Sequence, residues 1–341
     1  MGLLYQLKGD YKTLSIVGMA KNAGKTTALN YLIEEAMDEG LLLGITSTGR
    51  DGETCDLVTN TDKPKVYLDA GTIVTVPVQL YELAETGLEI IKRTKYGTSL
   101  GDLLLCRVAE SGYVQIAGPV SVADSKRLCD EMHTMGVDLI LIDGAIDRKS
   151  IAAPETSDAI ILATGAVLSR SLKKVVEETL HIVRLYGMQK LESGFIRDIV
   201  AEEIAGKNRI TLIDREGKAR FLDLKTSLGA SRFLDEAIDE TTTHIYIPGA
   251  LTQSVIEDIH PAKLKQVQVV LKDPTRIFIG AVLWQQLCKK GFHACVMENI
   301  EVAAVTVNPY SPEGYSFDHD ELRNAMQEAI PDIPVVDVKL G

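Results

Sequence analysis

The sequence predicts an α/β fold, in which a mostly parallel sheet flanked by helices is followed by a smaller C-terminal α/β domain. Short β-prone runs alternate with helix-like stretches in the first half. The runs at 137–142 and 159–163 are apolar apart from Asp138, as in strands covered on both faces. The second half changes to a hairpin-like pattern and short strands. With 341 residues the chain is long enough for two units, and we expect domains at 1–205 and 206–341.

The elements of the first domain follow from the period of its apolar residues and from its turn residues. After a strand at 13–18 and a glycine-containing turn, we expect a helix at 27–38, a strand at 41–46 and a long polar loop at 47–63. Strand-like residues at 65–76 and a helix from Pro77 to about Arg93 should follow. The rest of the domain is expected to hold two strands at 103–108 and 113–117, a helix capped by Ser121, and a helix at 169–186. The strands at 103–108 and 113–117 fit either a hairpin or two separate strands. In the second domain, 209–214 and 219–224 flank a turn and predict a hairpin.

Composition and charge narrow the classes of partner. Lys and Arg total 36 against 48 Asp and Glu, which gives a formal net charge of −12. This charge repels nucleic acid and anionic membranes, so neither is expected as a partner. The five cysteines are scattered without C-x-x-C spacing, and the first residues lack the pattern of a signal peptide. We therefore expect a soluble cytoplasmic protein.

The turn after the first strand carries the clearest functional motif. Residues 17–27 read Val-Gly-Met-Ala-Lys-Asn-Ala-Gly-Lys-Thr-Thr. Between a strand and a helix this order predicts a Walker A loop, because successive backbone N–H groups and a helix N-terminus enclose the phosphates of a nucleoside triphosphate. The predicted nucleotide-binding residues of this P-loop are Gly18, Lys21, Asn22, Ala23, Gly24, Lys25, Thr26 and Thr27. Lys25 would reach the β- and γ-phosphates, and the Thr26 hydroxyl would bind Mg²⁺. The first glycine of the usual pattern falls at Met19, with Gly18 one residue early.

An apolar strand that ends in an acidic residue supplies a second motif. Residues 139–144 read Leu-Ile-Leu-Ile-Asp-Gly, which resembles a Walker B element. The carboxyl ends of parallel strands share one edge of the sheet, so Asp143 is expected near the Mg²⁺ held by Thr26. A strand-end Asp without a Walker A loop beside it would more often be a turn or cap residue.

The polar loop after the second strand is a further candidate. Residues 47–56 contain Arg50, Asp51, Glu53 and Asp56. An acidic loop at this place could bind Mg²⁺ or orient the attacking water, as switch-like loops do in P-loop NTPases. Asp51 is our candidate for both the metal and the catalytic role. The alternative is a solvated loop with glycine turns.

Two other features admit several interpretations. Lys21 either adds positive charge over the phosphates or reaches a partner's site across a homodimer, as an extra lysine does in one class of P-loop proteins. The segment 305–315 has two prolines and two tyrosines. In it, Asn308 could read the edge of the base and Tyr310 or Tyr315 could stack on it. Docking of a protein partner and a plain connection are the alternatives.

Taken together, Lys-Asn-Ala-Gly-Lys-Thr-Thr at 21–27, Thr-Ser-Thr-Gly-Arg-Asp-Gly-Glu at 46–53 and Leu-Ile-Asp-Gly-Ala at 141–145 resemble the SIMIBI class of P-loop proteins over about the first 205 residues. With Val-Asn-Pro-Tyr-Ser-Pro-Glu-Gly-Tyr at 307–315, the chain is similar to the KamB family, a reactivase subunit associated with adenosylcobalamin-dependent lysine 5,6-aminomutase of lysine fermentation. The resemblance implies a chaperone that hydrolyses ATP, or GTP, with Mg²⁺, and so exchanges damaged for intact adenosylcobalamin on the aminomutase. A companion reactivase ATPase subunit would assist it.

Two other functions compete with this expectation. The first is an ATP-dependent biosynthetic enzyme resembling dethiobiotin synthetase, which phosphorylates a small carboxylate. The second is a GTPase that inserts a metal or cofactor. The six histidines lack metal-ligand spacing, which argues against metal handling. No Asn-Lys-x-Asp guanine signature is present, so ATP is favoured over GTP.

Overall fold

A computed structural model describes residues 2–7, 11–48, 66–98, 100–144, 156–223 and 230–339. The chain forms two compact units, one built from 1–180 with 301–341 and the other from 181–300. This division differs from the expected one, which placed the boundary near Gly206 and the C-terminal domain at 206–341. The reason is strand pairing, because the last strands of the chain return to the sheet of the first unit.

The first unit contains a nine-stranded sheet of order β16-β15-β9-β1-β8-β2-β4-β6-β5. All neighbours in it are parallel except β4/β6 and β5/β6. Its strands are β1 (Thr13–Gly18), β2 (Leu43–Ser47), β4 (Ile73–Pro77), β5 (Leu88–Thr98), β6 (Gly101–Val108), β8 (Leu139–Asp143), β9 (Ala159–Gly165), β15 (Val302–Asn308) and β16 (Val335–Val336). The chain is therefore an α/β protein with a large, mostly parallel mixed sheet.

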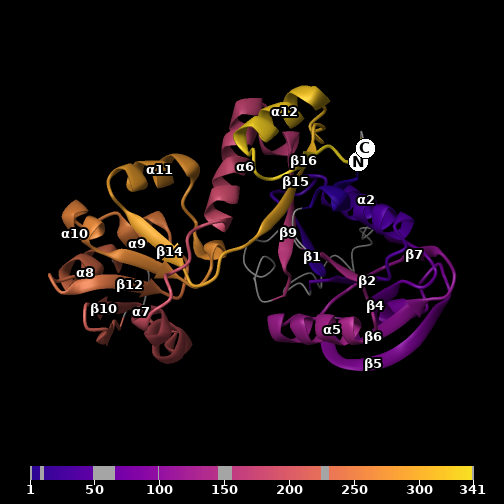
Figure 1. Cartoon of the computed structure of the whole chain (residues 1–341), viewed down its shortest axis with the longest axis horizontal. Coiled ribbons are helices and arrows are strands. Elements are labelled where there is room, and N and C mark those ends of the chain that lie inside the picture. Colours follow the sequence, from indigo (N-terminus) through magenta and orange to yellow (C-terminus); the bar gives the residue numbers. More distant parts are fainter. Residues whose placement is uncertain are drawn as a thin grey trace. The chain divides into compact units, whose positions relative to one another are not determined.

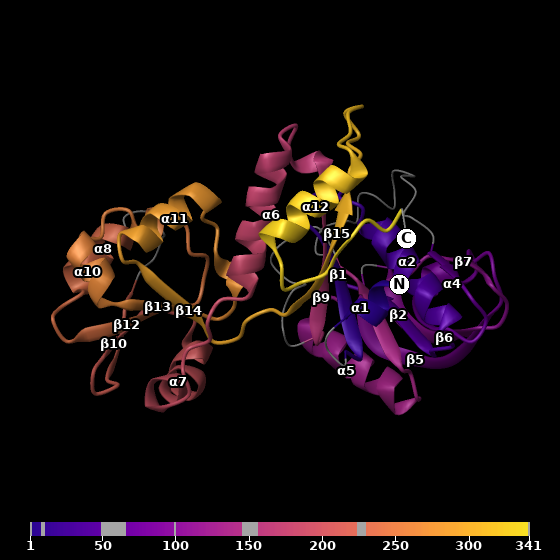
Figure 2. The ribbon, with the colours of Figure 1, turned by 45° about the horizontal axis from the view of Figure 1, so that its top comes forward.

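Helices cover both faces of this sheet (Figures 1 and 2). They are α1 (Leu3–Gln6), α2 (Lys25–Asp38), α4 (Val78–Tyr81), α5 (Val122–Thr134), α6 (Leu172–Tyr186) and α12 (His319–Ala329). Leu29, Leu32 and Ile33 of α2 pack in one apolar cluster with Leu14 and Ile16 of β1. Leu128 and Met132 of α5 pack with Ile140 and Ile142 of β8 in a second cluster. Alternate residues of neighbouring strands thus enter different cores, as a sheet covered on both faces requires.

Two predictions for the first unit are settled by strand pairing. Strand β6 pairs with β4 and β5, whereas β7 (Gly112–Val114) pairs with β3 (Val66–Leu68), so 103–108 and 113–117 do not form a hairpin with each other. The helix predicted from Pro77 to about Arg93 is wrong beyond α4. From Leu88 onward the chain instead forms strand β5, which pairs antiparallel with β6. The predicted cap is confirmed, since Ser121 Oγ accepts the backbone N–H of Asp124 at 3.1 Å.

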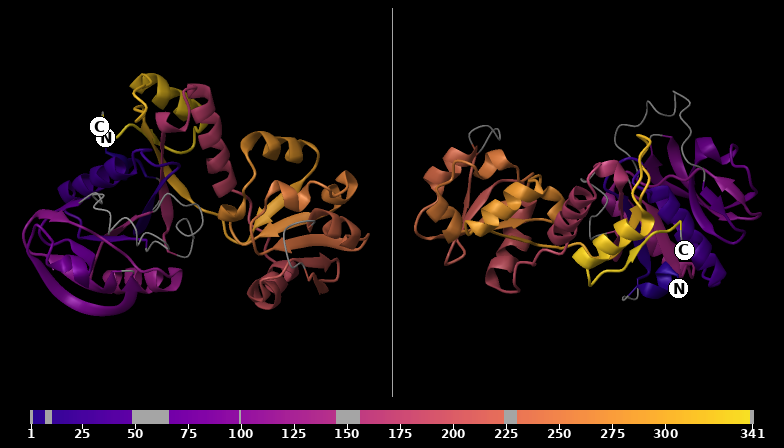
Figure 3. Two further views of the ribbon diagram at one scale, coloured as in Figure 1. Left: turned by 180° about the vertical axis from the view of Figure 1, so that it is seen from behind. Right: turned by 90° about the horizontal axis from the view of Figure 1, so that it is seen from above.

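The second unit contains a five-stranded sheet of order β11-β10-β12-β13-β14 (Figure 3). Its strands are β10 (Thr211–Asp214), β11 (Ala219–Phe221), β12 (Thr242–Ile247), β13 (Gln268–Leu271) and β14 (His293–Val296). Its helices are α7 (Phe195–Ile199), α8 (Ala230–Ala237), α9 (Gln253–Ile256), α10 (Pro261–Gln266) and α11 (Ala281–Lys289). The predicted hairpin is confirmed by the antiparallel pairing of β10 with β11. Strands β12, β13 and β14 are parallel. None of the helices described in either unit combines the length and the apolar character that a membrane crossing needs.

Candidate functional site

The loop between β1 and α2 contains two residues with positive φ just before the helix begins. Gly24 is the N-cap of α2 and has φ 97°, and Asn22 has φ 66°. Positive φ is rare for a residue with a side chain, and Asn tolerates it better than most. The first turn of α2 carries no acidic residue, so no carboxylate of that turn opposes the positive end of the helix dipole. The loop can therefore present backbone N–H groups to an anion.

Lys25 and Asp143 meet at the carboxyl edge of the sheet. Strand β8 lies beside β1, with Asp143 in register with Ile16. Lys25 Nζ lies 2.6 Å from Asp143 Oδ1 and also donates to the Gly144 carbonyl. The two side chains are only 13% and 22% exposed. The two residues belong to separate motifs 118 positions apart in the sequence, and the fold brings them into direct contact.

The other predicted residues of this loop occupy different environments. Gly18 ends β1, and the next residue, Met19, donates its N–H to the Ala163 carbonyl of β9 at 2.9 Å. Ala23 is buried, whereas Lys21 and Asn22 are exposed. Thr26 and Thr27 are half-buried in the first turn of α2. Asp51 lies outside the described residues.

Asn308 contacts the same loop from the end of β15. Its Nδ2 donates to the Asn22 carbonyl at 3.2 Å, and its Oδ1 accepts the Tyr310 N–H at 3.2 Å. A Cβ added at Gly24 would lie 3.1 Å from the Asn308 Cβ. Asn308 therefore links the loop to the segment after β15. Its carboxamide bonds to protein groups in this structure, and base recognition remains a prediction.

The packing of Asn308 depends on a glycine of the neighbouring strand, which gives a testable prediction. A Cβ at Gly165 would lie 2.0 Å from the Asn308 carbonyl oxygen. We expect Gly165→Ala to lower the free energy of unfolding by about 1–3 kcal/mol, because two paired strands must separate. We also expect it to weaken nucleotide binding. Chemical denaturation and calorimetric titration measure the two effects.

Gly206→Ala is the matched control for that substitution. A Cβ at Gly206 meets nothing within 4 Å, and its φ is not in the left-handed region. Equal stability of Gly165→Ala and Gly206→Ala would contradict the close approach of β9 and β15.

A chain of side-chain contacts behind Asn308 was not predicted from the sequence. The Tyr310 hydroxyl lies 2.9 Å from His319 Nε2, and His319 Nδ1 lies 2.5 Å from Asp337 Oδ2. The Asp337 side chain is only 2% exposed. When the neutral His319 ring carries its hydrogen on Nδ1 and donates it to Asp337, its Nε2 accepts a hydrogen bond from the Tyr310 hydroxyl. Lys339 Nζ lies 4.9 Å from the centre of the Tyr310 ring. Tyr310, His319 and Asp337 have no motif-like spacing in the sequence, so their contact could not be predicted from it.

A small hollow lies beside the end of β2, close to the backbone of Asp143. Thr46, Ser47 and Thr48 of the β2 end line it. The Thr48 N–H donates to the Asp143 carbonyl at 3.1 Å. Within the described part of the chain, the buried Thr48 Oγ1 has no hydrogen-bond partner. The remaining lining residues are Pro119, Val120, Val122, Ser125, Ile142 and Thr156.

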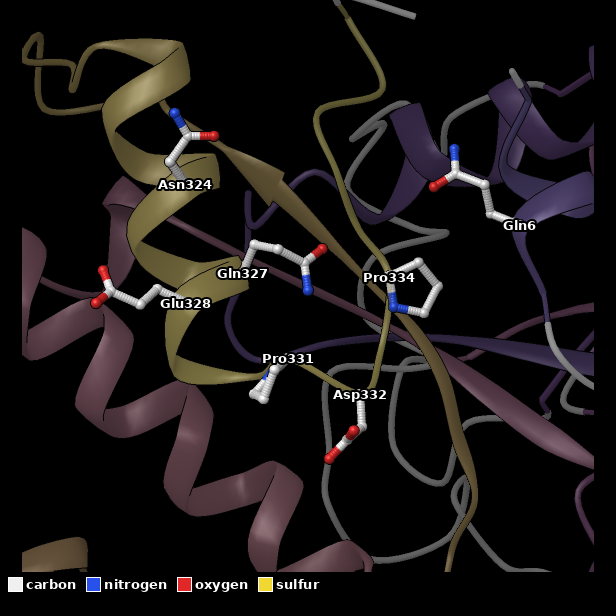
Figure 4. Close-up of a pocket in the computed structure, with 7 residues that line it drawn as sticks. All are labelled: Gln6, Asn324, Gln327, Glu328, Pro331, Asp332 and Pro334. Atoms are coloured by element: carbon white, nitrogen blue, oxygen red, sulfur yellow. The ribbon is translucent and has the colours of Figure 1, made fainter.

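A second surface hollow, between α12 and Gln6, has a structural explanation (Figure 4). Gln327 extends into it, and its Nε2 donates to the carbonyls of Ile330 and Ile333 at 2.9 and 3.0 Å. Its Oε1 accepts the Val335 N–H at 3.0 Å. The amide thus fixes the turn between α12 and β16, and we assign no ligand to this hollow.

The residues of the β1–α2 site fit a cation that is coordinated by oxygen atoms and that arrives with a nucleotide. Thr26 and Asp143 offer hydroxyl and carboxylate oxygens, which are the ligands that Mg²⁺ prefers. Among the described residues no group of three or more His, Cys, Asp or Glu could hold a metal by itself. Mg²⁺ commonly takes only one or two protein ligands and its remaining ligands from phosphates and water.

No family model, curated protein or solved structure matches this chain. The functional conclusion therefore rests on the fold and on the geometry of the β1–α2 site.

Proposed function

We propose that the chain is a P-loop nucleoside triphosphatase, which binds ATP, or GTP, with Mg²⁺ at residues 18–27 and hydrolyses it. The observation that carries the proposal is the contact of 2.6 Å between Lys25 Nζ and Asp143 Oδ1 at the start of α2. In parallel α/β sheets, ligands bind outside the carboxyl ends of the strands. A lysine, a carboxylate and a helix N-terminus at that edge form a set suited to a Mg²⁺-bound triphosphate.

Each residue of the site has a definite role in this proposal. The backbone N–H groups of the loop and of the first turn of α2 would receive the phosphates. Lys25 would leave Asp143 and donate to the β- and γ-phosphates, since an ammonium binds a multiply charged phosphate strongly. Thr26 and the released Asp143 would then bind Mg²⁺ directly or through water. The bound nucleotide supplies the phosphoryl group that water attacks. Asp51 remains our candidate for orienting that water.

Nucleotide binding is tested directly by calorimetric titration of the full chain with ATP and with GTP, each with Mg²⁺ or with EDTA. We expect binding to need Mg²⁺, because the metal neutralises phosphate charge that Lys25 alone does not balance. We also expect ATP to bind more tightly than GTP. Equal affinity in EDTA would contradict the proposed role of Thr26 and Asp143.

We extend the proposal to a biological role, which is supported by the resemblance to the KamB family. Hydrolysis would switch the chain between two states that differ in affinity for an adenosylcobalamin-dependent aminomutase, so that damaged cofactor leaves and intact cofactor enters. Only such a difference in affinity lets a nucleotide drive the exchange. A companion reactivase ATPase subunit would act with it.

The reactivase role is tested with lysine 5,6-aminomutase that has been inactivated by turnover. The assay adds this protein, the companion subunit, ATP, Mg²⁺ and fresh adenosylcobalamin. We expect aminomutase activity to recover only with ATP, and not with the Lys25→Ala protein. If activity does not recover with any nucleotide although the proteins form a complex, the reactivase role is excluded. That result would not contradict the proposed nucleotide site.

One observation favours a second candidate function. The hollow lined by Thr46, Ser47, Thr48 and Val120 lies beside the backbone contact of Thr48 with Asp143, and a small second substrate bound over it would face the γ-phosphate of the proposed nucleotide. An enzyme that phosphorylates a small carboxylate, as dethiobiotin synthetase does, would use such a hollow. Turnover of ATP that a panel of small carboxylates stimulates without any protein partner would favour this enzyme over the reactivase.

A further inference from the structure

An exposed pair of tyrosines lies on the two-stranded ribbon of the first unit, outside the residues of the proposed nucleotide site. Tyr67 of β3 and Tyr113 of β7 are direct partners in the antiparallel register. They are 46% and 47% exposed, and their ring centres lie 5.3 Å apart in an edge-to-face contact. The alternate residues Val66 and Val114 are buried in the main core. The outward face of this ribbon is therefore aromatic.

Acidic residues border the ribbon that carries the tyrosines, as two contacts of their backbones show. The Glu85 N–H donates to the Tyr113 carbonyl at 3.1 Å, and the Glu110 carbonyl accepts the hydroxyl of Thr86. Glu82 and the 66% exposed Leu83 directly follow α4, which lies near β7 (Figure 2). Residues 66–91 contain four acidic residues and no Lys or Arg, and residues 108–114 add Glu110 and no cation. We call Tyr67, Leu83 and Tyr113, with Glu82, Glu85 and Glu110, the acidic tyrosine face.

We propose that the acidic tyrosine face binds a protein segment that carries Arg or Lys beside an apolar or aromatic side chain. Exposed tyrosines give large, rigid contact area and are enriched where proteins bind one another. The tyrosine rings attract cations, and Arg guanidinium groups in particular stack on them. The acidic residues that border the ribbon complement the charge of such a segment and would speed its association. This inference is independent of nucleotide hydrolysis.

Two other modes of association of the first unit are less favourable. A second copy of this chain would place one acidic face against another, and like charges across an interface are unfavourable. Addition of a strand to the open edge at β5 is opposed by Lys92, Arg93 and Lys95 and by the irregular register between Ile90 and Lys92. Charged side chains and bulges are features that protect sheet edges from pairing.

The test uses the full chain and three short synthetic peptides labelled for fluorescence anisotropy. One combines Arg with Leu and Trp, one replaces each Arg of that peptide by Glu, and one contains only Arg. We expect the Arg–Leu–Trp peptide to bind at least about tenfold more tightly than either of the others. Hydrogen exchange should then show protection at 66–68 and 112–114. Equal binding of the Arg-only peptide, or protection only elsewhere, would overturn the proposal.

Variants distinguish peptide binding at this face from nonspecific attraction of a basic peptide to a negatively charged protein. We expect Tyr67→Ala/Tyr113→Ala to weaken binding of the Arg–Leu–Trp peptide by about tenfold or more. Tyr5→Ala, at a tyrosine that is 68% exposed elsewhere, should not change binding. If loss of both tyrosines unfolds the ribbon, Glu82→Lys/Glu110→Lys tests the same face through charge, with Glu236→Lys on α8 as its control.

Unchanged binding by folded variants of the face would reject the proposal. A dimer in light scattering that disappears in Tyr67→Ala/Tyr113→Ala would reject it too, because it would assign the face to a second copy of the chain.

Discussion

Replacing Lys25 by Ala should reduce the affinity for ATP–Mg²⁺ by about 10- to 100-fold or more. A hydrogen bond to a charged group contributes roughly 1.5–3 kcal/mol, and about 1.4 kcal/mol corresponds to tenfold in affinity. Lys25 would make more than one such bond, to the β- and γ-phosphates. Its loss also leaves Asp143 without its cation near the phosphates, since the two groups are 2.6 Å apart. Calorimetric titration of the folded variant measures the change.

Lys21→Ala compares the second lysine of the same loop, for which two roles are open. Lys21 is exposed, and a lysine that only adds distant charge should change affinity by less than about threefold at ordinary ionic strength. A loss of turnover that appears together with concentration-dependent dimerisation would instead assign Lys21 to a partner's site. Wild-type affinity in Lys25→Ala would refute the Walker A assignment.

The sequence was sufficient to predict the features that depend on local pattern. The strand at 13–18, the helix expected at 27–38, which begins two residues earlier at Lys25, and the buried strand that ends at Asp143 follow from apolar periodicity and glycine placement. Parallel strands share a carboxyl edge, so the proximity of Lys25 and Asp143 could also be expected before the structure was known. The hydrogen-bonded cap at Ser121 is equally local.

Features that depend on distant pairing could not be predicted in this way. The segment 78–93 begins with a proline-initiated helical turn, but residues 88–98 gain more from pairing with β6 than from continuing a helix. The return of β15 to β9 moves Asn308 next to Asn22, although the two are 286 residues apart. Nothing in the spacing of Tyr310, His319 and Asp337 indicates their contact. Register and crossover, rather than composition, determine these neighbours.

Asp143→Asn should separate nucleotide binding from turnover. The amide keeps the shape of the side chain but removes the charge that binds Mg²⁺ and stabilises the transition state, so we expect kcat to fall on the order of 100-fold. Affinity for ATP should change little, because loss of a Mg²⁺ ligand is offset by release of Lys25 from its ion pair. Single-turnover hydrolysis at limiting Mg²⁺, with titration of the same protein, measures both quantities.

The control for this substitution lies at the other end of the same strand. Asp138 precedes β8, is exposed, and accepts the Leu42 N–H at 2.8 Å through Oδ2. Asp138→Asn retains an acceptor oxygen and lies at the opposite edge of the sheet from Lys25, so its kcat should equal that of the wild type. If Asp143→Asn also hydrolyses ATP normally when Mg²⁺ is limiting, Asp143 serves only to hold Lys25 in place, and another carboxylate, with Asp51 first, must bind the metal.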